Sequence, residues 1–267
     1  MASITKRILD AIDAYKKRDI HASRKAHSPD SIRAALEPHK SESGAYIGEA
    51  VYGALDGIVT TFAVVAGVAG AKLSAGVVLI LGFANLVGDG LSMGVGSYLS
   101  TKSRLEYEQS EREREFWEVE NYPEGEIHEI REIYRKKGFE GDDLERAVGV
   151  ITSNKEIWVE TMMNEELGII KEDSHPFFSG LSTFIAFVIA GFIPLLFFVL
   201  ALALPSLSQY SFQMSVILTA ITLFGVGSLK VMVTRTSWWR SGLEMLIVGG
   251  ATALGAYIVG YLLQGLA

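Results

Sequence analysis

The chain has 267 residues, of which 21% are charged and 49% hydrophobic, and its mean hydropathy is +0.27. A net charge of −7 argues against nucleic acid as a partner, because nucleic-acid-binding proteins present basic surfaces. The chain contains no cysteine, which excludes disulfides, thiolate metal ligands and cysteine nucleophiles.

The first 44 residues are polar and basic, with nine Lys and Arg side chains. Apolar residues in Ile4–Lys17 recur at helical spacing, which is compatible with a helix on a membrane surface. A solvated tail with one short helix is the simpler interpretation, and we prefer it. Residues 1–44 contain no apolar segment of the kind that a secretory signal requires.

Two long apolar segments follow, Tyr46–Ala71 and Leu73 to about Thr101. Each is long enough to cross a hydrocarbon core of roughly 30 Å as a helix. Only a tight turn at Lys72 separates them, so they are expected to form an antiparallel pair. Small residues at four-residue spacing predict close helix contacts; these pairs are Gly53–Gly57, Gly90–Gly94 and Gly96–Ser100.

Residues 102–175 are predicted to form a soluble insert, since residues 101–175 hold 21 of the 31 acidic side chains. Three helices are expected there, at Ser103 to about Glu120, at Glu124–Lys137, and from an N-cap at Asp142 to Gly168. The break between the first two coincides with Pro123 and Gly125. The insert is therefore expected to be a small three-helix domain.

Three further apolar segments complete the chain: Phe177–Leu204, interrupted or kinked at Pro194, then Phe212–Val233 and Leu243–Leu266. The predicted fold is an all-α polytopic membrane protein with five transmembrane helices and the insert between the second and third. The expected divisions are a tail (1–44), two spans (45–101), the insert (102–175) and three spans (176–267).

Basic residues predict the orientation. The tail and the 230–240 turn together hold twelve Lys and Arg side chains, whereas the turns on the opposite side hold one, Lys72. Because cytosolic loops are enriched in Lys and Arg, the N-terminus and the insert are expected in the cytosol and the C-terminus on the opposite side.

Carboxylates and methionines in the insert form a candidate metal site. Glutamates three residues apart share a helix face, and folding the helices together could gather them beside thioethers. The candidates are Glu115, Glu118, Glu126, Glu129, Met162, Met163 and Glu166. Oxygen ligands alone suit Mg²⁺, Ca²⁺ or Mn²⁺, and thioether sulfur shifts the preference toward Fe²⁺. The alternative is a solvated helix with ordinary ion pairs three and four residues apart, and core methionines.

Carboxylates inside the spans are a second candidate site, because a charge at the bilayer centre costs about 2.5–3.5 kcal/mol. Glu49 and Asp56 share a face of the first span, and Asp89 and Met93 share a face of the second. Asp56 and Met93 would offer a hard and a soft ligand, and protonation of the carboxylates could couple metal movement to protons. The alternatives are a helix–helix hydrogen bond for Asp89 and simple packing for Met93.

Four segments carry a resemblance to a known family: YGALDGIVTTFAVVAGVAGA (52–71), LVGDGLSMGVGSYLSTKS (86–103), the insert's EREREFWEVENYPEGE, and MMNEELGI (162–169). They resemble the vacuolar iron transporter family over about residues 45–267. The resemblance implies a homodimer in the lipid bilayer, with a pore lined by the first two helices at the two-fold axis. It also implies Fe²⁺/H⁺ antiport out of the cytosol, across the vacuolar membrane of a eukaryote or the plasma membrane of a prokaryote.

The resemblance also assigns residues. Family pore positions fall on Asp56 and Met93, whereas Glu49 and Asp89 remain candidates from their place in the spans. The family's metal-binding glutamates fall on Glu115, Glu118, Glu126, Glu129 and Glu166, with Met162 and Met163 alongside. Iron is the implied cargo and ligand of the insert, which could also take Mn²⁺, Zn²⁺ or Co²⁺.

Three other functions remain open. One is a transporter whose main cargo is Mn²⁺, and another is a regulatory metal sensor. The third is a membrane-tethered ferritin-like iron-binding or ferroxidase module, which would carry Glu-x-x-His pairs that this sequence lacks. No glycine-rich phosphate loop supports ATP-driven pumping, and no serine–histidine constellation indicates hydrolysis, so the protein is predicted not to be an enzyme.

Overall fold

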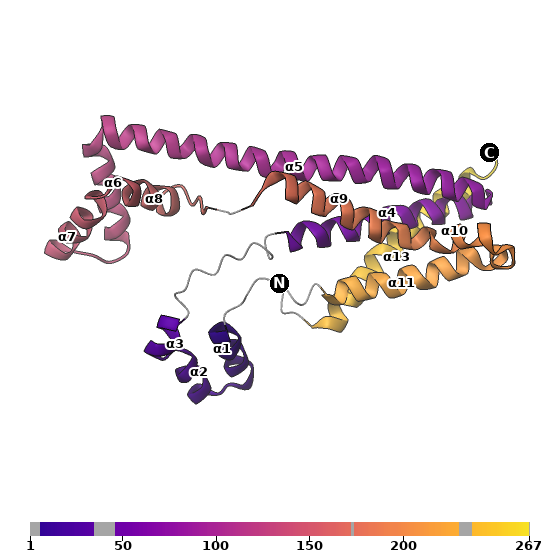
Figure 1. Ribbon diagram of the computed structural model, residues 1–267, viewed down its shortest axis with the longest axis horizontal. Helices are drawn as coiled ribbons and strands as arrows, with labels where there is room; N and C mark the ends of the chain where they lie inside the picture. Colours follow the sequence, from indigo (N-terminus) through magenta and orange to yellow (C-terminus); the bar gives the residue numbers. More distant parts are fainter. Residues whose placement is uncertain (1–5, 35–45, 172–173, 230–236, 267) are drawn as a thin grey trace. The chain divides into compact units, whose positions relative to one another are not determined.

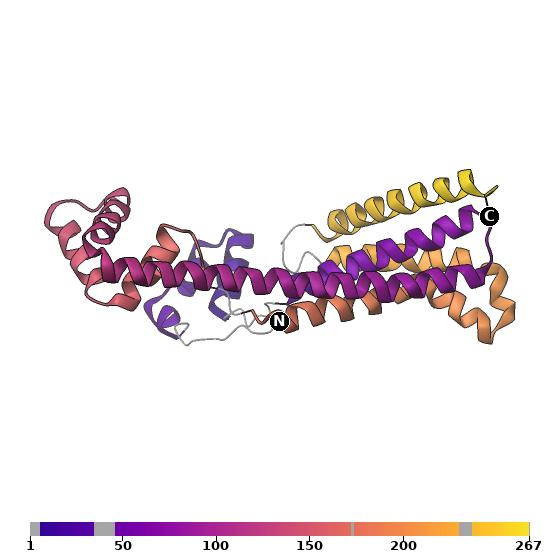
Figure 2. The same cartoon turned by 90° about the horizontal axis from the view of Figure 1, so that it is seen from above.

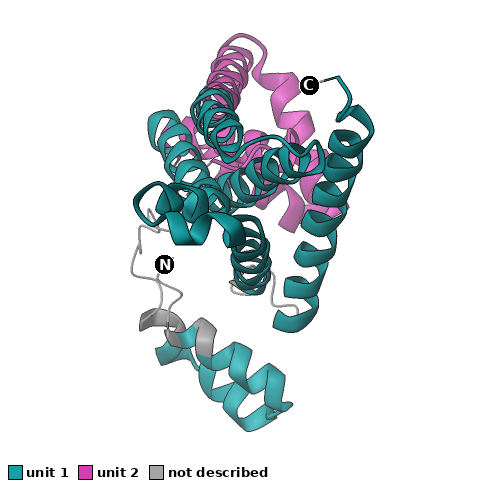
Figure 3. Ribbon diagram, turned by 90° about the vertical axis from the view of Figure 1, so that its right-hand side faces the viewer, with its two compact units in different colours: residues 1–98, 176–267 teal, residues 99–175 magenta. Residues whose placement is uncertain are grey.

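A computed structural model describes residues 6–34, 46–171, 174–229 and 237–266, and in these ranges all regular structure is helical. The chain divides into two compact units (Figure 3). The membrane unit comprises Met1–Tyr98 and Pro176–Ala267, and the acidic unit comprises Leu99–His175.

Three short helices begin the chain: α1 (Lys6–Lys17), α2 (Ile20–Ala26) and α3 (Pro29–Ala34). Asp19 begins α2 because its carboxylate accepts a hydrogen bond from the Ala22 N–H at 3.0 Å. The short helix predicted in the tail is therefore present as α1. Its predicted start at Ile4, and residues 35–44 of the tail, lie outside the described residues.

Five helical stretches of the described residues are long and apolar enough to cross a membrane, as predicted. Figures 1 and 2 show α4, α9, α11 and α13 side by side in one bundle. The helices of these stretches are α4 (Ile47–Gly70), α5 (Ala75–Asn121), α9 (Pro176–Phe192), α10 (Leu196–Ala203), α11 (Ser211–Leu229) and α13 (Trp238–Leu263). The predicted end of the fourth span at Val233 lies outside the described residues.

The break predicted at Pro194 is confirmed. A 3₁₀ turn, η2 (Ile193–Leu195), separates α9 from α10, because proline has no N–H to donate and clashes with the preceding turn. The Pro194 carbonyl accepts a hydrogen bond from the Ser215 hydroxyl of α11 at 2.6 Å, so the broken helix is tied to its neighbour. A second 3₁₀ segment, η3 (Pro205–Tyr210), leads into α11.

Glycines bring α4 against α9, as the four-residue spacing predicts. A Cβ on Gly53 would overlap the Thr183 carbonyl oxygen, and one on Gly57 would overlap that of Phe187. Gly90 and Gly94 of α5 likewise face α9, because a Cβ added to either would lie 3.0–3.4 Å from Phe184. A Cβ on Gly96 meets no described atom within 4 Å, so the predicted Gly96–Ser100 contact does not form within this chain.

The acidic unit differs from the predicted three-helix domain. Its helices are α5 residues 99–121, α6 (Pro123–Lys136), α7 (Gly141–Thr152) and α8 (Lys155–Glu165). The predicted second span and the first insert helix are one continuous helix, because no Gly or Pro interrupts residues 97–121.

The predicted third helix of the insert, Asp142–Gly168, is wrong as a single element. It breaks at Ser153 because Asn154 starts α8, accepting hydrogen bonds from the N–H groups of Glu156 (3.0 Å) and Ile157 (3.2 Å). The residue before α7 is Glu140, so the predicted N-cap at Asp142 is also wrong. The four helical segments share one apolar core: Val119, Ile130, Leu144, Val148, Trp158, Val159, Met162 and Met163.

Candidate functional site

The predicted glutamates of the acidic unit come together in the structure. Glu115 and Glu118 lie on α5, Glu126 and Glu129 on α6, and Glu166 caps the C-terminus of α8. The charges of Glu118, Glu129 and Glu166 act on both Glu115 and Glu126, and the charge of Glu115 acts on Glu126 as well. Folding therefore gathers five carboxylates that span more than 50 residues of sequence.

The turn between α5 and α6 makes this possible. Helix α5 ends at Asn121, and Pro123 occupies the first turn of α6, where its missing N–H costs no hydrogen bond. A Cβ on Gly125 would overlap the Tyr122 ring, so a larger residue in this turn would require that exposed ring to move. Glu126 then falls in the first turn of α6, where the helix dipole favours a negative charge.

Two carboxylates of the cluster are buried. The side chain of Glu115 is 1% exposed and Glu126 is 5% exposed. One oxygen of each, Oε2, is buried with no hydrogen-bond partner among the described residues. Burying a charged oxygen without a partner is expensive, so both positions are suited to a cation.

The electrostatics agree with this geometry. Burial raises the pKa of Glu115 to about 7, against the opposing effect of Arg114, and nearby glutamates raise it further. Burial, followed by the charge of Glu129, raises the pKa of Glu126 to about 7. Partial desolvation and Glu129 also raise the pKa of Glu166. These groups gain from a positive partner near neutral pH.

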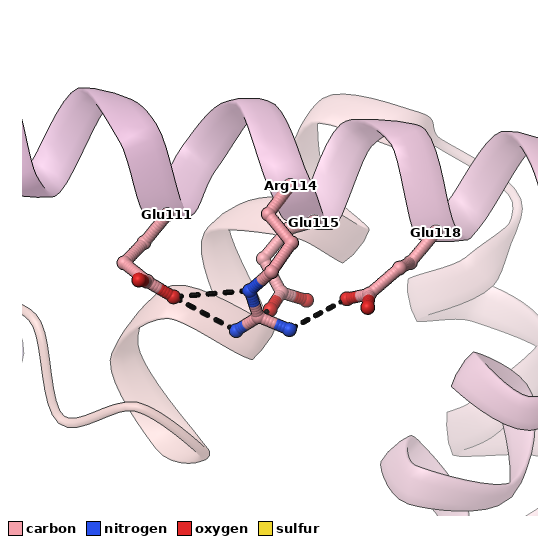
Figure 4. Close-up of polar contacts among 4 residues, drawn as sticks. All are labelled: Glu111, Arg114, Glu115 and Glu118. Atoms are coloured by element: carbon pink, nitrogen blue, oxygen red, sulfur yellow. Dashed lines mark hydrogen bonds and ion pairs between the residues drawn. The ribbon is translucent and has the colours of Figure 1, made fainter.

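Arg114 supplies part of that positive charge (Figure 4). Its guanidinium lies 2.9 Å from Glu115 Oε1, and it donates hydrogen bonds to Glu118 Oε2 at 2.7 Å and to Glu111 Oε2 at 2.9 and 3.1 Å. The ordinary ion pairs of the alternative interpretation therefore do form along α5. These ion pairs do not explain why two of the carboxylates are buried, because a solvated helix would leave them exposed.

The methionines lie in the apolar core of the same unit, Met162 0% and Met163 2% exposed. Met162 is one turn before Glu166, whose N–H donates to the Met162 carbonyl at 3.0 Å. Among the described residues, no three Asp, Glu or His side chains are close enough to hold one ion as they stand. A closed metal site would require the carboxylates to move together, and sulfur ligation stays a prediction.

In the membrane unit, Asp56 of α4 is half-buried, and the exposed Asp89 of α5 is close enough to interact with it electrostatically. Among the described residues, hydrogen bonds between α4 and α5 come from Asn85, whose amide donates to Thr60 Oγ1 at 3.3 Å and Thr61 Oγ1 at 3.4 Å. Sequence reasoning assigned no role to Asn85 and proposed this kind of bond for Asp89.

The two remaining pore candidates lie along the same helices. Glu49 is half-buried in the first turn of α4, and Met93 is half-buried against the apolar core of the membrane unit. Their part in a pore stays a prediction.

Comparison with known proteins identifies related sequences. Residues 47–261 match the VIT family. The chain is 40% identical over 264 residues to "Vacuolar iron transporter" of Toxoplasma gondii, covering 95% of this chain and 87% of the relative. It is 34% identical to "Vacuolar iron transporter" of Plasmodium berghei (97% of each chain) and 31% identical to "Vacuolar iron transporter 1" of Arabidopsis thaliana (87% and 96%). The matched residues include the helices of the five apolar stretches and the acidic unit.

Proposed function

Because the chain belongs to the VIT family, we propose that it is a membrane transporter that moves Fe²⁺ out of the cytosol in exchange for protons. Its relatives are named vacuolar iron transporters, and the five apolar helical stretches of the described residues could provide the membrane-embedded body that transport requires. Relatives named as transporters also argue against an enzyme. The proposed location is the vacuolar membrane, or the plasma membrane in a prokaryotic host.

One observation carries the proposal: two buried carboxylates, Glu115 and Glu126, each keep an unpartnered oxygen among further glutamates and buried thioethers. This donor set suits a divalent cation, and the thioethers of Met162 and Met163 favour Fe²⁺ over Mg²⁺ or Ca²⁺. The acidic unit then acts as a cytosolic collecting site. Mn²⁺, Zn²⁺ and Co²⁺ are the ions that would compete there.

The transport path itself is proposed to run past Asp56 and Met93, with Glu49 and Asp89 contributing. A homodimer would place the first two spans of both chains around one pore at the two-fold axis. A carboxylate in hydrocarbon is costly as a lone charge, so either a proton or a metal ion should neutralise it. Alternation between these two partners would couple Fe²⁺ movement to proton movement.

The test is Fe²⁺ uptake into proteoliposomes under an imposed pH gradient, for wild type and for Asp56→Asn. We expect gradient-dependent uptake by wild type and none by the variant. Glu145→Gln is the matched control, because this exposed carboxylate pairs with Arg131 in the acidic unit and should leave transport unchanged. Uptake that ignores the gradient would refute antiport, and normal uptake by Asp56→Asn would refute the pore assignment. Equal competition by Mn²⁺ would favour the manganese alternative.

A further inference from the structure

The position of Arg114 suggests a role that the cluster alone does not explain. Figure 4 shows its guanidinium between the carboxylates of Glu111, Glu115 and Glu118. It contacts Oε1 of the buried Glu115 at 2.9 Å and donates to Glu118 at 2.7 Å. Both glutamates are proposed metal ligands, so a cation bound to their carboxylates would lie close to the positive charge of Arg114.

Two other arginines of the acidic unit pair with glutamates outside the proposed ligand set. Arg112, two residues earlier on α5, pairs with Glu160 at 2.5 Å, and Arg131 pairs with Glu145 at 2.9 and 3.0 Å. Arg114, by contrast, acts electrostatically on Glu115 and also on Glu166 of α8. Arg114 therefore interacts with glutamates of the proposed metal site, whereas the other two arginines pair with glutamates outside it.

The side chain of Arg114 can also move away from the proposed ligands without losing all of its partners. Its side chain is 44% exposed, so its ion pairs with the partly exposed Glu111 and Glu118 are individually weak, whereas Glu115 is buried. Two of its hydrogen bonds, from Nε and Nη2, go to Glu111, which lies outside the proposed ligand set. The side chain can therefore release Glu115 and Glu118 and remain on Glu111, and a dication bound to those two carboxylates would repel the guanidinium from them.

We propose that Arg114 competes with metal ions for the carboxylates of the collecting site. An incoming divalent cation displaces Arg114 from Glu115 and Glu118, and the guanidinium stays bound to Glu111. This rests on the proposed function of the cluster. Arg114 compensates the carboxylates and lowers the net affinity for metal. A moderate affinity suits a site that must pass its ion on to a pore rather than store it.

The experiment measures Co²⁺ binding to the full-length protein in detergent by calorimetry. Arg114→Gln should bind Co²⁺ roughly three- to tenfold more tightly, because two or three weak ion pairs no longer compete. Arg112→Gln removes the same charge from the same helix but leaves the cluster's contacts intact, and should stay within about twofold of wild type. Unchanged or weaker binding by Arg114→Gln would overturn the proposal in favour of a purely structural arginine.

A second variant tests displacement itself. Glu111→Gln removes the acceptor that receives Arg114, so it should weaken Co²⁺ binding in the wild-type background and have no such effect beside Arg114→Gln. Additive effects of the two substitutions would contradict the displacement step. If the glutamate cluster is not a metal site at all, Glu115→Gln with Glu126→Gln would bind Co²⁺ as wild type does. This result distinguishes failure of the proposed metal site from failure of the proposed role of Arg114.

Discussion

The two units differ in the kind of polar side chain that they bury. In the membrane unit the buried polar side chains are mostly hydroxyls, and they often donate to backbone carbonyls, as Thr183 does to Ser179 and Ser215 to Pro194. In the acidic unit they are Thr101 and the carboxylates of Glu115 and Glu126, and one oxygen of each carboxylate has no hydrogen-bond partner among the described residues. The membrane unit therefore buries uncharged hydroxyls, two of which (Ser179 and Thr219) also lack a described partner, whereas the acidic unit buries negative charge that a cation from outside would neutralise.

The packing of the helices also differs between the two units. Backbones of α4 and α9 touch at glycines, so the membrane unit tolerates little change in helix spacing. The acidic unit holds its helices together through an apolar core and through exposed ion pairs such as Lys137–Glu165 (2.5 Å), which permit small rearrangements. Substitutions should therefore damage stability most in the first unit and metal binding most in the second.

The largest expected effect is on the membrane unit. Gly57→Val would force its side chain into the Phe187 carbonyl, and because backbone rather than a flexible side chain is in the way, we expect a loss of about 3 kcal/mol or more. Thermal unfolding in detergent should show little folded protein. Gly250→Ala is the control, since a Cβ there meets no described atom within 4 Å, and it should unfold as wild type does. A Gly57→Val protein with wild-type stability would contradict the close contact.

The next largest effect is on metal binding. Glu115→Gln with Glu126→Gln should weaken Co²⁺ binding by on the order of 100-fold, because two anionic ligands become neutral amides. The same change should stabilise the protein in chelator by about 1 kcal/mol, since it removes two costly buried charges. Calorimetry and thermal unfolding check the two parts, with Glu145→Gln as the exposed control. Loss of both affinity and stability would indicate a structural role only.

Sequence patterns predicted the features that depend on local or periodic signals. Apolar length gave the five spans, Pro194 gave the break, and four-residue spacing gave the contacts of Gly53 and Gly57. Three-residue spacing also predicted that Glu115 and Glu118, and likewise Glu126 and Glu129, share a helix face, because a helix places such pairs on one face whatever the tertiary fold.

Other features depended on competition between signals or on tertiary placement. The charged start of the insert indicated a new helix, although nothing stops α5 before Asn121. Asn154 followed by Glu156 was a cap signal within an otherwise helical pattern, and it was missed. The sequence offered Arg114 several glutamates at helical spacing and could not show that one of them is buried. A pore formed by two chains cannot be assembled from one chain's periodicity.

An intermediate effect is expected from pH. The raised pKa values of Glu115 and Glu126, about 7, mean that protons compete with metal as pH falls through neutrality. Co²⁺ affinity should therefore fall between roughly 10-fold and 100-fold from pH 8 to pH 6, for one or two displaced protons. The same raised values imply that the contribution of these two carboxyls to the stability of the metal-free protein is greatest below pH 4.5, the ordinary value, and is lost as pH rises through about 7. Calorimetry across this range checks the slope, and a flat profile would contradict the burial of these carboxylates.

The smallest expected effect concerns the one polar link described between α4 and α5. Asn85→Ala removes hydrogen bonds of 3.3 and 3.4 Å to Thr60 and Thr61, and such bonds between membrane helices contribute about 0.6 kcal/mol. We expect a small drop in unfolding temperature with Fe²⁺ uptake retained, because Asn85 holds the helices that carry Asp56 and Asp89 without being a ligand. Thr60→Val with Thr61→Val should lower stability similarly, and adding Asn85→Ala to that pair should cost little more. If Asn85→Ala abolished uptake while unfolding as wild type does, the Asn85 amide would belong to the transport path. The membrane unit would then contain a functional polar group that also makes hydrogen bonds between helices.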